Sequence, residues 1–319
     1  MNNDVLVSVD QVSRFYGPLR AVNSVSFEVR RGEVLGFLGP NGAGKTTTMQ
    51  MITGNLAPSA GQIKIHGIDI LDEPKRAKAE LGFLPEQPPL YRELTVDEYL
   101  TYCARLNRVP AGKLAGALDN AKQRCGLTQV SQRLIGNLSK GYQQRVGIAQ
   151  AIIHSPAVVI LDEPTVGLDP IQIREIRALI RELGGTHSVI LSTHILPEVQ
   201  ATCDRVQIIN KGSLVMSDTI AGLTQRMLGS GLLIALRKNV EPGVLQAVPG
   251  VLNVEALGEN RYRLHFAENQ NPAEALVEKS VQQGWGLYEL TPERMSLEEI
   301  FVNITRTEAH AETPAEAAA

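Results

Sequence analysis

The sequence predicts an α/β protein in which a parallel sheet carries a phosphate-binding loop. Three observations support this fold class. The apolar segment 34–38 predicts a buried strand, and residues 39–46 after it fit the pattern G-x-x-x-x-G-K-[ST]. Residues 45–53 contain neither proline nor glycine and are expected to form the helix that follows such a loop. Two more continuous apolar runs, 157–161 and 188–192, predict buried parallel strands farther along the chain.

The loop at 39–46 has the chemistry of a nucleotide phosphate site. Glycines let the backbone approach closely, so several N–H groups can point at one anion. The N-terminus of the following helix adds roughly half a positive charge. Lys45 is expected to reach the β- and γ-phosphates, and the Thr46 hydroxyl to hold Mg²⁺. The predicted nucleotide contacts in and beside the loop are Gly39, Pro40, Asn41, Gly42, Ala43, Gly44, Lys45, Thr46 and Thr47.

The composition argues against several other classes of protein. The net charge over 319 residues is −3, which disfavours a dedicated nucleic-acid binder. Cys103, Cys125 and Cys203 lie far apart and form no C-x-x-C pair, so neither a zinc site nor a disulfide framework is indicated. No apolar run approaches the roughly 18 residues of a membrane span, and the N-terminus lacks a signal-peptide pattern. We therefore expect a soluble, cytosolic protein that reaches a membrane only through a partner.

The segments around the loop predict two additions to the parallel sheet. Alternating segments predict a small antiparallel sheet packed against the loop's strand; they are 5–9, 24–29 and 61–65. Residues 88–155 predict a helical insert, which includes helices at 95–106 and 113–125. Thr95 and Glu98 have the spacing of a capping box at the start of the first of these helices.

The character of the sequence changes near residue 223. The apolar runs become shorter, and they predict strands at 232–236, 251–257, 261–266 and 287–290, with helices at 271–283 and 296–304. This order predicts a small ferredoxin-like α+β module over 223–306, following a first domain over 1–222. Residues 307–319 are mostly Ala, Glu and Thr and are expected to be a disordered tail.

Polar residues follow several of the predicted strands, where ligands of open α/β sheets bind. Asp162 and Glu163 end the run 157–161, so Asp162 is expected to coordinate Mg²⁺ and Glu163 to polarise an attacking water. His194 follows the strand at 188–192 and is expected to contact the γ-phosphate or the water. Gln87 follows a short strand that ends near residue 84, and it is expected to sense the metal.

Two further features point to the nucleotide. Ser139 and Gly141 head a helix of the insert whose N-terminus can receive an anion, although it does not belong to the phosphate loop. This helix therefore predicts either a second nucleotide or the nucleotide of a second copy of the chain. Tyr16 lies upstream of the loop and could stack on an adenine ring, although an ordinary packed loop residue would look the same.

Together these residues resemble the ATPase subunit of an ATP-binding cassette (ABC) transporter over about residues 5–216. The loop at 39–46 is similar to the Walker A motif, and 158–163 to Walker B. Tyr16, Gln87 and His194 stand where the family has its adenine-stacking aromatic, Q-loop glutamine and switch histidine, and 168–169 is similar to the D-loop. The segment 138–143 resembles the signature motif, with Lys140 and Tyr142 in place of the Gly and Gln of LSGGQ.

The resemblance implies ATP and Mg²⁺ as ligands and a head-to-tail homodimer, or a pair with a related ATPase subunit. Each nucleotide would lie between one copy's Walker A loop and the other copy's Ser139 and Gly141. The implied catalytic residues are Lys45, Gln87, Glu163 and His194, and the implied metal ligands are Thr46, Gln87 and Asp162.

The resemblance also implies that integral membrane permease subunits, and no nucleic acid, are the partners. The protein would then be peripheral on the cytoplasmic face of the cell membrane. Tyr91, Leu94 and Tyr99 are expected to form a docking groove for the permease or, equally, ordinary helix packing.

The segment after about residue 225 resembles the appendix of ABC-2-type exporter ATPases, which favours export as the direction of transport. A soluble ABC ATPase acting on nucleic acid or the ribosome is the alternative function. Such proteins usually carry coiled-coil inserts, zinc modules or two cassettes, and this sequence has none of these patterns. A stand-alone P-loop kinase would leave the signature helix unexplained.

Overall fold

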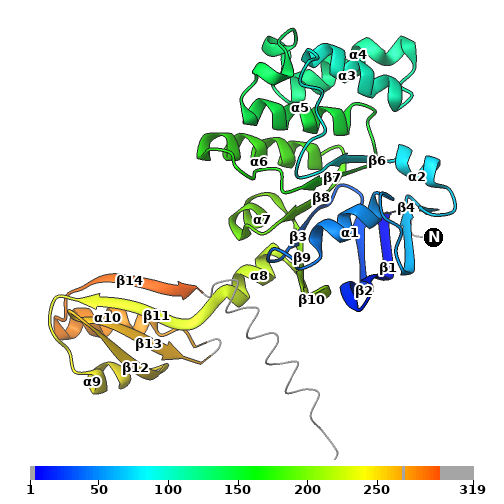
Figure 1. Ribbon diagram of the computed structural model, residues 1–319. Coiled ribbons are helices and arrows are strands. Elements are labelled where there is room, and N and C mark those ends of the chain that lie inside the picture. Colours follow the sequence, from blue (N-terminus) through cyan, green and yellow to red (C-terminus); the bar gives the residue numbers. More distant parts are fainter. Residues whose placement is uncertain (1–3, 268–269, 295–319) are drawn as a thin grey trace, which may run out of the picture. The chain divides into compact units, whose positions relative to one another are not determined.

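The computed structural model describes residues 4–267 and 270–294, and the chain divides into two compact units (Figure 1). The first unit is Met1–Ile220 and the second is Ala221–Ala319. Each unit has its own sheets and its own hydrophobic core. The two units are therefore described separately.

A six-stranded sheet forms the centre of the first unit. Its strand order is β10-β9-β3-β8-β7-β6; the five strands from β9 to β6 are parallel to one another, and β10 is antiparallel to β9. The strands are β3 (Val34–Leu38), β6 (Leu81–Leu84), β7 (Val158–Asp162), β8 (Ser188–Thr193), β9 (Arg205–Asn210) and β10 (Ser213–Thr219). Every residue of β3, β7 and β8 is buried, as expected for continuous apolar runs in a parallel sheet. The predicted α/β fold with a parallel sheet is confirmed.

Helices cover both faces of this sheet. Helix α1 (Lys45–Ile52) lies on one side of β3 and β8, and α7 (Leu196–Thr202) lies on the other (Figure 1). Helix α6 (Pro170–Gly184) packs against α7 and β8. It begins where the Asp169 carboxylate accepts two backbone N–H groups, each at 2.9 Å, with Pro170 at the first helical position.

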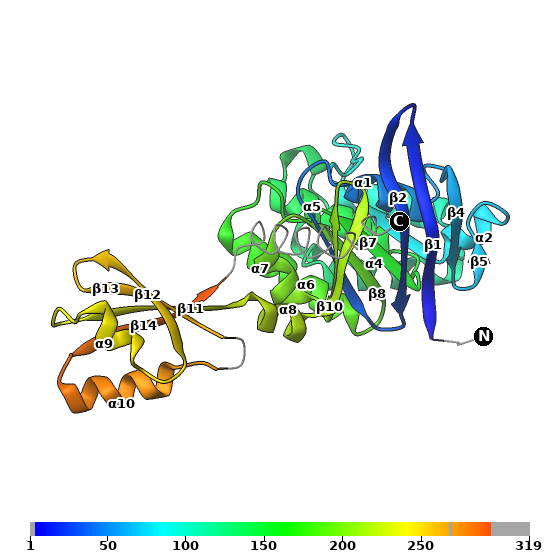
Figure 2. The same ribbon diagram turned by 90° about the horizontal axis from the view of Figure 1, so that it is seen from below.

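A separate antiparallel sheet of order β2-β1-β4-β5 confirms the predicted subdomain. Its strands are β1 (Val5–Tyr16), β2 (Leu19–Arg30), β4 (Ala60–Ile65) and β5 (Ile68–Asp69). Figure 2 shows β1 and β2 as one long hairpin. Both strands are longer than predicted because the pairing shifts register between Val9 and Val12, where Gln11 has φ +47°. Such a bulge interrupts the alternation from which strand length was inferred. Phe27 and Phe37, with ring centroids 5.5 Å apart, join the cores of the two sheets.

The insert consists mainly of α3 (Val96–Leu106), α4 (Ala111–Arg124) and α5 (Lys140–Ile152), with short helices η1 (Thr128–Val130) and η2 (Ile135–Asn137) between them. Another short helix, α2 (Pro74–Ala79), precedes β6. The predicted capping box is present, because Thr95 N donates to the Glu98 carboxylate at 2.8 Å and Thr95 Oγ1 accepts from Glu98 N. In the predicted docking groove, Tyr91 is exposed, whereas Tyr99 is buried and packs edge-on against it.

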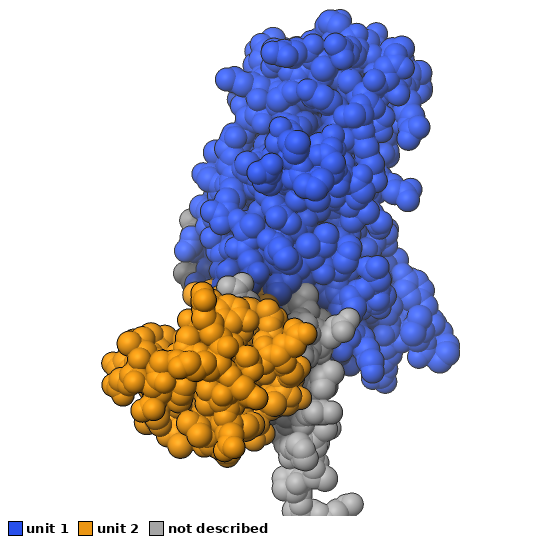
Figure 3. Space-filling view, turned by 90° about the vertical axis from the view of Figure 1, so that its left-hand side faces the viewer, with its two compact units in different colours: residues 1–220 blue, residues 221–319 orange. Residues whose placement is uncertain are grey.

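The described part of the second unit contains a four-stranded antiparallel sheet and the helices α8, α9 and α10, and the unit is drawn in orange in Figure 3. Its elements in chain order are α8 (Ile220–Met227), β11 (Leu228–Leu236), α9 (Pro242–Gln246), β12 (Val251–Gly258), β13 (Arg261–Phe266), α10 (Ala273–Gln283) and β14 (Leu287–Arg294). The strand order β12-β13-β11-β14 with all neighbours antiparallel is the ferredoxin-like arrangement. This confirms the fold class predicted for the C-terminal module. Tyr262, Leu264 and Trp285 lie in its core.

Two sequence-based predictions fall on other parts of the chain. The helix expected at 296–304 and the tail expected at 307–319 lie outside the described residues. Among the residues that are described, no helix combines the length and the apolar character needed to cross a bilayer.

A truncated chain tests whether the first unit is an independent domain. We expect residues 1–220 alone to melt cooperatively and to bind nucleotide, because every residue of the core shared by the two sheets of this unit lies before residue 220. Circular dichroism melting and nucleotide titration would measure both properties against the full chain. A truncated product without a cooperative transition would show that the first unit depends on residues after 220.

Candidate functional site

The pairing of four strands brings the residues predicted for catalysis and metal binding to one sheet edge. Strands β3, β8, β7 and β6 are successive parallel neighbours, so their carboxyl ends lie side by side. The phosphate loop follows β3, and His194 follows β8. Asp162 ends β7 with Glu163 directly after it, and the segment with Glu86 and Gln87 follows β6. Residues far apart in sequence can therefore act on one ligand.

Glycine is required within the phosphate loop for steric reasons. Gly42 and Gly44 have φ values of +80° and +104°, which side chains disfavour. A Cβ on Gly44 would also lie 2.6 Å from the Ala21 carbonyl oxygen of β2. The loop curls around the end of the Lys45 side chain, whose Nζ donates to the carbonyl oxygens of Gly39 at 2.9 Å and Pro40 at 3.3 Å.

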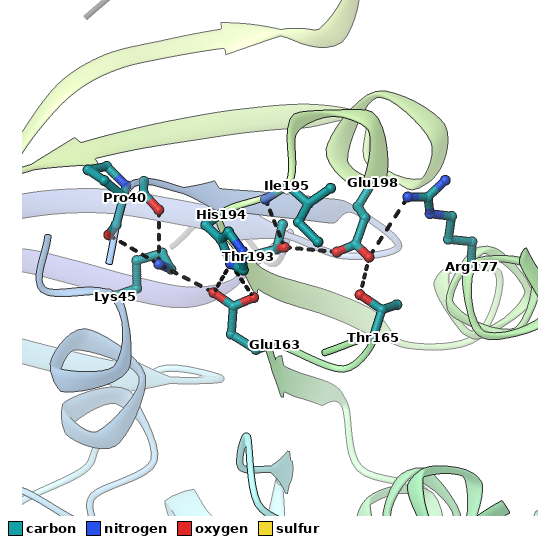
Figure 4. A network of polar contacts seen from close by, with 10 residues as sticks. Pro40, Lys45, Glu163, Thr165, Arg177, Thr193, His194, Ile195 and Glu198 are labelled. Carbon is teal, nitrogen blue, oxygen red and sulfur yellow. Dashed lines mark hydrogen bonds and ion pairs between the residues drawn. The ribbon is translucent and has the colours of Figure 1, made fainter. Parts of the chain in front are cut away.

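Glu163 lies between two basic side chains (Figure 4). Its Oε1 is 3.3 Å from Lys45 Nζ, and its carboxylate oxygens are 3.1 and 3.0 Å from His194 Nδ1. Glu163 is buried, and its φ of +48° is unusual for a residue with a side chain. A hydrogen bond of 2.8 Å from Glu163 N to Ser192 O on β8 helps to hold this conformation. Strained backbone of this kind persists only where surrounding contacts enforce it, as they often do at functional sites.

Asp162 fits the role of a metal ligand. The residue is 1% exposed, and neither carboxylate oxygen has a hydrogen-bond partner. The pKa of Asp162 is raised, mainly by burial and also by the charges of Glu163 and Glu86. The nearby hydroxyls of Ser192 and Thr46 oppose this rise. A buried carboxylate without a partner is unfavourable unless a cation compensates it. Among the described residues no three His, Cys, Asp or Glu side chains gather as a metal site.

A cavity of about 660 Å³ opens over this edge and is large enough for a nucleotide. Its lining residues are Leu19, Arg20, Ala21, Asn41, Gly42, Gly44, Lys45, Thr46, Thr47, Glu86, Glu163, Val166, His194, Lys211 and Gly212. Most predicted phosphate-loop contacts are on this lining, together with Glu163 and His194. The cations of Arg20, Lys45 and Lys211 make it a suitable environment for a polyanion.

Several predicted site residues, including Asp162, are not on the lining of this cavity. Gln87 instead lines a neighbouring cavity of about 630 Å³, and Glu86 lines both cavities. Tyr16 ends β1, is 46% exposed, and has the Arg14 guanidinium 4.8 Å from its ring centroid. Gly39, Pro40 and Ala43 are also absent from the lining, although the first two hold Lys45 through their carbonyl oxygens.

The signature segment lies at the start of α5, away from the phosphate cavity of its own chain. Ser139 is the N-cap, and its Oγ accepts from Tyr142 N at 3.5 Å. A Cβ on Gly141 would lie 2.5 Å from the Gln172 side chain, so glycine allows this close approach. Neither Ser139 nor Gly141 lines the phosphate cavity of the same molecule.

Sequence reasoning did not identify four charged residues near the site, namely Arg20, Glu86, Glu198 and Lys211. Lys211 and Gly212 form the turn between β9 and β10, and Gly212 N donates to Ala43 O of the phosphate loop at 2.9 Å. No local sequence pattern indicates this contact between the turn and the phosphate loop. Glu198 lies on α7, a seven-residue helix that was not predicted because so short a segment with an early proline has little periodicity.

Comparisons with known proteins agree with this geometry. The sequence profile of the ABC transporter family matches residues 22–166. The chain is 30% identical over 299 residues to the uncharacterized ABC transporter ATP-binding protein YxlF of Bacillus subtilis (strain 168). This alignment covers 94% of this chain and 99% of YxlF. It is 37% identical to the bacitracin transport ATP-binding protein BcrA of Bacillus licheniformis over 66% of this chain and 68% of that protein.

A solved structure extends the likeness to three dimensions. The structure of cbiO1 from Clostridium perfringens, described as part of the ABC transporter complex cbiONQ, matches with a TM-score of 0.64 and 29% identity. The match covers 69% of this chain and 90% of that chain. With the strand order, the phosphate loop and the near full-length relative, these findings confirm the family inferred from the motifs. The chain belongs to the ATP-binding proteins of ABC transporters, a family that hydrolyses ATP.

Proposed function

We propose that this chain is the ATPase subunit of an ABC-2-type exporter and works as a head-to-tail dimer on separate membrane permeases. The observation that carries the proposal is the convergence of Lys45, Glu163 and His194 on one cavity, with the anion-receiving N-terminus of α5 outside it. The name of BcrA, a bacitracin transport protein, supports a transport role. In this proposal the subunit is peripheral to the cytoplasmic face of the membrane.

Lys45 would exchange partners when ATP binds. Its ammonium group now contacts two loop carbonyl oxygens and Glu163 Oε1. Phosphate oxygens are stronger partners for an ammonium group than neutral carbonyls, because both sides of the contact are charged. Moving Lys45 onto the β- and γ-phosphates would release the Glu163 carboxylate from this ion pair.

Glu163 would then act as the general base. Its carboxylate would accept the proton of the water that attacks the γ-phosphorus, and the bond from that phosphorus to the β–γ bridging oxygen would break to release ADP. His194 would keep the carboxylate oriented through the 3.0 Å contact. Thr46 and Asp162 are the proposed metal ligands, and bound Mg²⁺ would neutralise charge on the β- and γ-phosphate oxygens. Of the two neighbours after β6, we favour Glu86 over Gln87 as the residue that faces this metal, because only Glu86 lines the phosphate cavity.

The second copy would complete the site. Ser139 and Gly141 at the N-terminus of its α5 would approach the γ-phosphate, where the helix dipole favours negative charge. Only a closed dimer offers this contact, so ATP binding would favour closure and hydrolysis would favour opening. Tyr16 stays the proposed adenine contact, since nearly half of its surface is exposed.

The alternative function is a soluble ABC ATPase that acts on nucleic acid or the ribosome. The net charge of −3 gives no electrostatic support for that alternative.

Tyr91 and Tyr102 form an exposed aromatic pair on the insert, with ring centroids 5.6 Å apart, and offer a surface for a permease segment.

Co-purification tests the transporter role directly. We expect the tagged chain, extracted from detergent-solubilised membranes, to bring down a protein with several transmembrane helices in near-stoichiometric amount. Mass spectrometry would identify it, and a Tyr91→Ala/Tyr102→Ala variant should retain less of it if the aromatic pair is the docking surface. Recovery of ribosomes or nucleic acid in place of a membrane protein would favour the alternative function.

Replacing the proposed base separates ATP binding from hydrolysis. Glu163→Gln keeps the shape of the side chain but cannot accept the proton, so we expect kcat to fall by about 10²- to 10⁴-fold. ATP affinity should persist, and gel filtration with ATP should show a stable dimer. The exposed Glu259→Gln variant serves as the control. Hydrolysis by Glu163→Gln at the wild-type rate would remove Glu163 from the proposed role.

A pair of neighbouring variants decides which residue after β6 faces the metal. We expect Glu86→Ala to raise the Mg²⁺ concentration needed for half-maximal ATP binding several-fold, because it removes a carboxylate beside Thr46 and Asp162. Gln87→Ala should leave that concentration unchanged. Calorimetric titration of ATP at graded Mg²⁺ would measure both variants. The opposite pattern would restore Gln87 as the metal-facing residue.

A further inference from the structure

We propose that Glu198 on α7 is a positioning residue that sets the geometry between Glu163 and His194. This inference rests on the proposed function, because it assumes that Glu163 and His194 serve hydrolysis. It assigns a role to a buried charge that touches neither the phosphate loop nor the cavity lining. Figure 4 shows Glu198 beside the Lys45, Glu163 and His194 group.

Each oxygen of the Glu198 carboxylate holds a different segment. Oε1 accepts a hydrogen bond from the hydroxyl of Thr165, two residues after Glu163. Oε2 accepts from the hydroxyl of Thr193 at 2.8 Å, one residue before His194. Glu198 is 1% exposed, and both threonines are buried, so water does not compete for these bonds. One carboxylate therefore links the segment that follows β7 to the end of β8.

The contact with Thr193 fixes the backbone on both sides of His194. Thr193 Oγ1 donates to Glu198 and accepts from Ile195 N at 3.1 Å, so the turn that presents His194 is closed by one hydroxyl. The contact with Thr165 fixes the turn that follows Glu163. Glu163 itself has a φ of +48°, and such a conformation needs support from its surroundings. The spacing between Glu163 and His194 thus depends on two segments that meet at Glu198.

A carboxylate suits this task better than other side chains. An ionised glutamate offers two acceptor oxygens, and both hydroxyls here donate. The charge is compensated by Arg177 of α6, whose Nη2 lies 3.9 Å from Oε1. A residue buried only for packing would not require a charge, because burying an ion is unfavourable unless it is paired and hydrogen-bonded.

Kinetics of the full chain distinguish positioning from simple structural support. We expect Glu198→Ala to lower kcat about 10- to 100-fold, the loss that a displacement of about 1 Å at a reacting group brings. The KM for ATP should stay near the wild-type value, because Lys45 Nζ is held by the Gly39 and Pro40 carbonyl oxygens and by Glu163, and the variant leaves these groups in place. Glu198→Gln should recover part of kcat, since the amide oxygen still accepts one hydroxyl.

Val199→Ala is the matched control. Val199 is the next residue of α7, is fully buried, and packs toward Gly36 of β3, so its truncation also lowers the melting temperature. It leaves both threonine contacts in place, and its kcat should stay near wild type. If Glu198→Ala keeps the kcat of Val199→Ala at a similar melting temperature, the positioning role is overturned.

Two isosteric variants keep the test decisive if Glu198→Ala does not fold. Thr165→Val and Thr193→Val each remove one hydroxyl, and each should lower kcat with little change in KM. Each should also cause less additional loss in a Glu198→Gln background than alone, because partners in one network are not additive. Unchanged kcat in both single variants would overturn the inference.

Glu163→Gln, measured in parallel, separates the inference from the proposed function on which it rests. If Glu163→Gln abolishes hydrolysis while the Glu198 and threonine variants do not affect it, only the positioning role fails. If Glu163→Gln retains hydrolysis, the proposed function of the site fails as well.

Discussion

The parallel pairing of four neighbouring strands is the constraint on which the rest of the site depends. Because β3, β8, β7 and β6 run in the same direction and in adjacent positions, their carboxyl ends meet at one edge. Side chains alternate along a strand, so a slip of β7 by one residue would turn the Asp162 side chain to the opposite face of the sheet. Full burial of β7 and β8 on both faces opposes such a slip, and the hydrophobic core thereby determines the chemistry at its edge.

The site keeps several features that would be unfavourable elsewhere in the protein. Glu163 has a left-handed backbone conformation, and Asp162 is a buried carboxylate without a hydrogen-bond partner. The Lys45 ammonium is buried and shared between carbonyl oxygens and Glu163. Ligand phosphates would give Lys45 charged partners and a cation would compensate Asp162, so these two features would favour binding. Glu163 N donates to Ser192 O of β8, and the Thr193 hydroxyl donates to Glu198 of α7, so both segments of the site are tied to neighbouring elements.

The second unit is stabilised in a different way. One face of its antiparallel sheet packs on a core that includes Trp285. Other side chains of the strands form ion pairs, such as those of Arg263 with Glu255 and Glu293. Exposed pairs of this kind contribute little stability, so the core holds the unit together. The alignment with YxlF covers 94% of this chain and takes in most of the second unit, which therefore recurs in a relative of similar length.

The sequence by itself determined the phosphate loop, the buried strands and the capping box, and it placed Glu163 and His194 just after strands and Lys45 at the start of a helix. These features depend on neighbours along the chain, because glycine conformations, side-chain alternation and helix caps are local. Only the tertiary structure decided that Glu86 rather than Gln87 lines the phosphate cavity, and that Glu198 joins Thr165 to Thr193. Those outcomes depend on which segments become neighbours in space and which way a loop turns after its strand. No local pattern contains that information, because burial and hydrogen bonding between distant segments arise only once the sheet has formed.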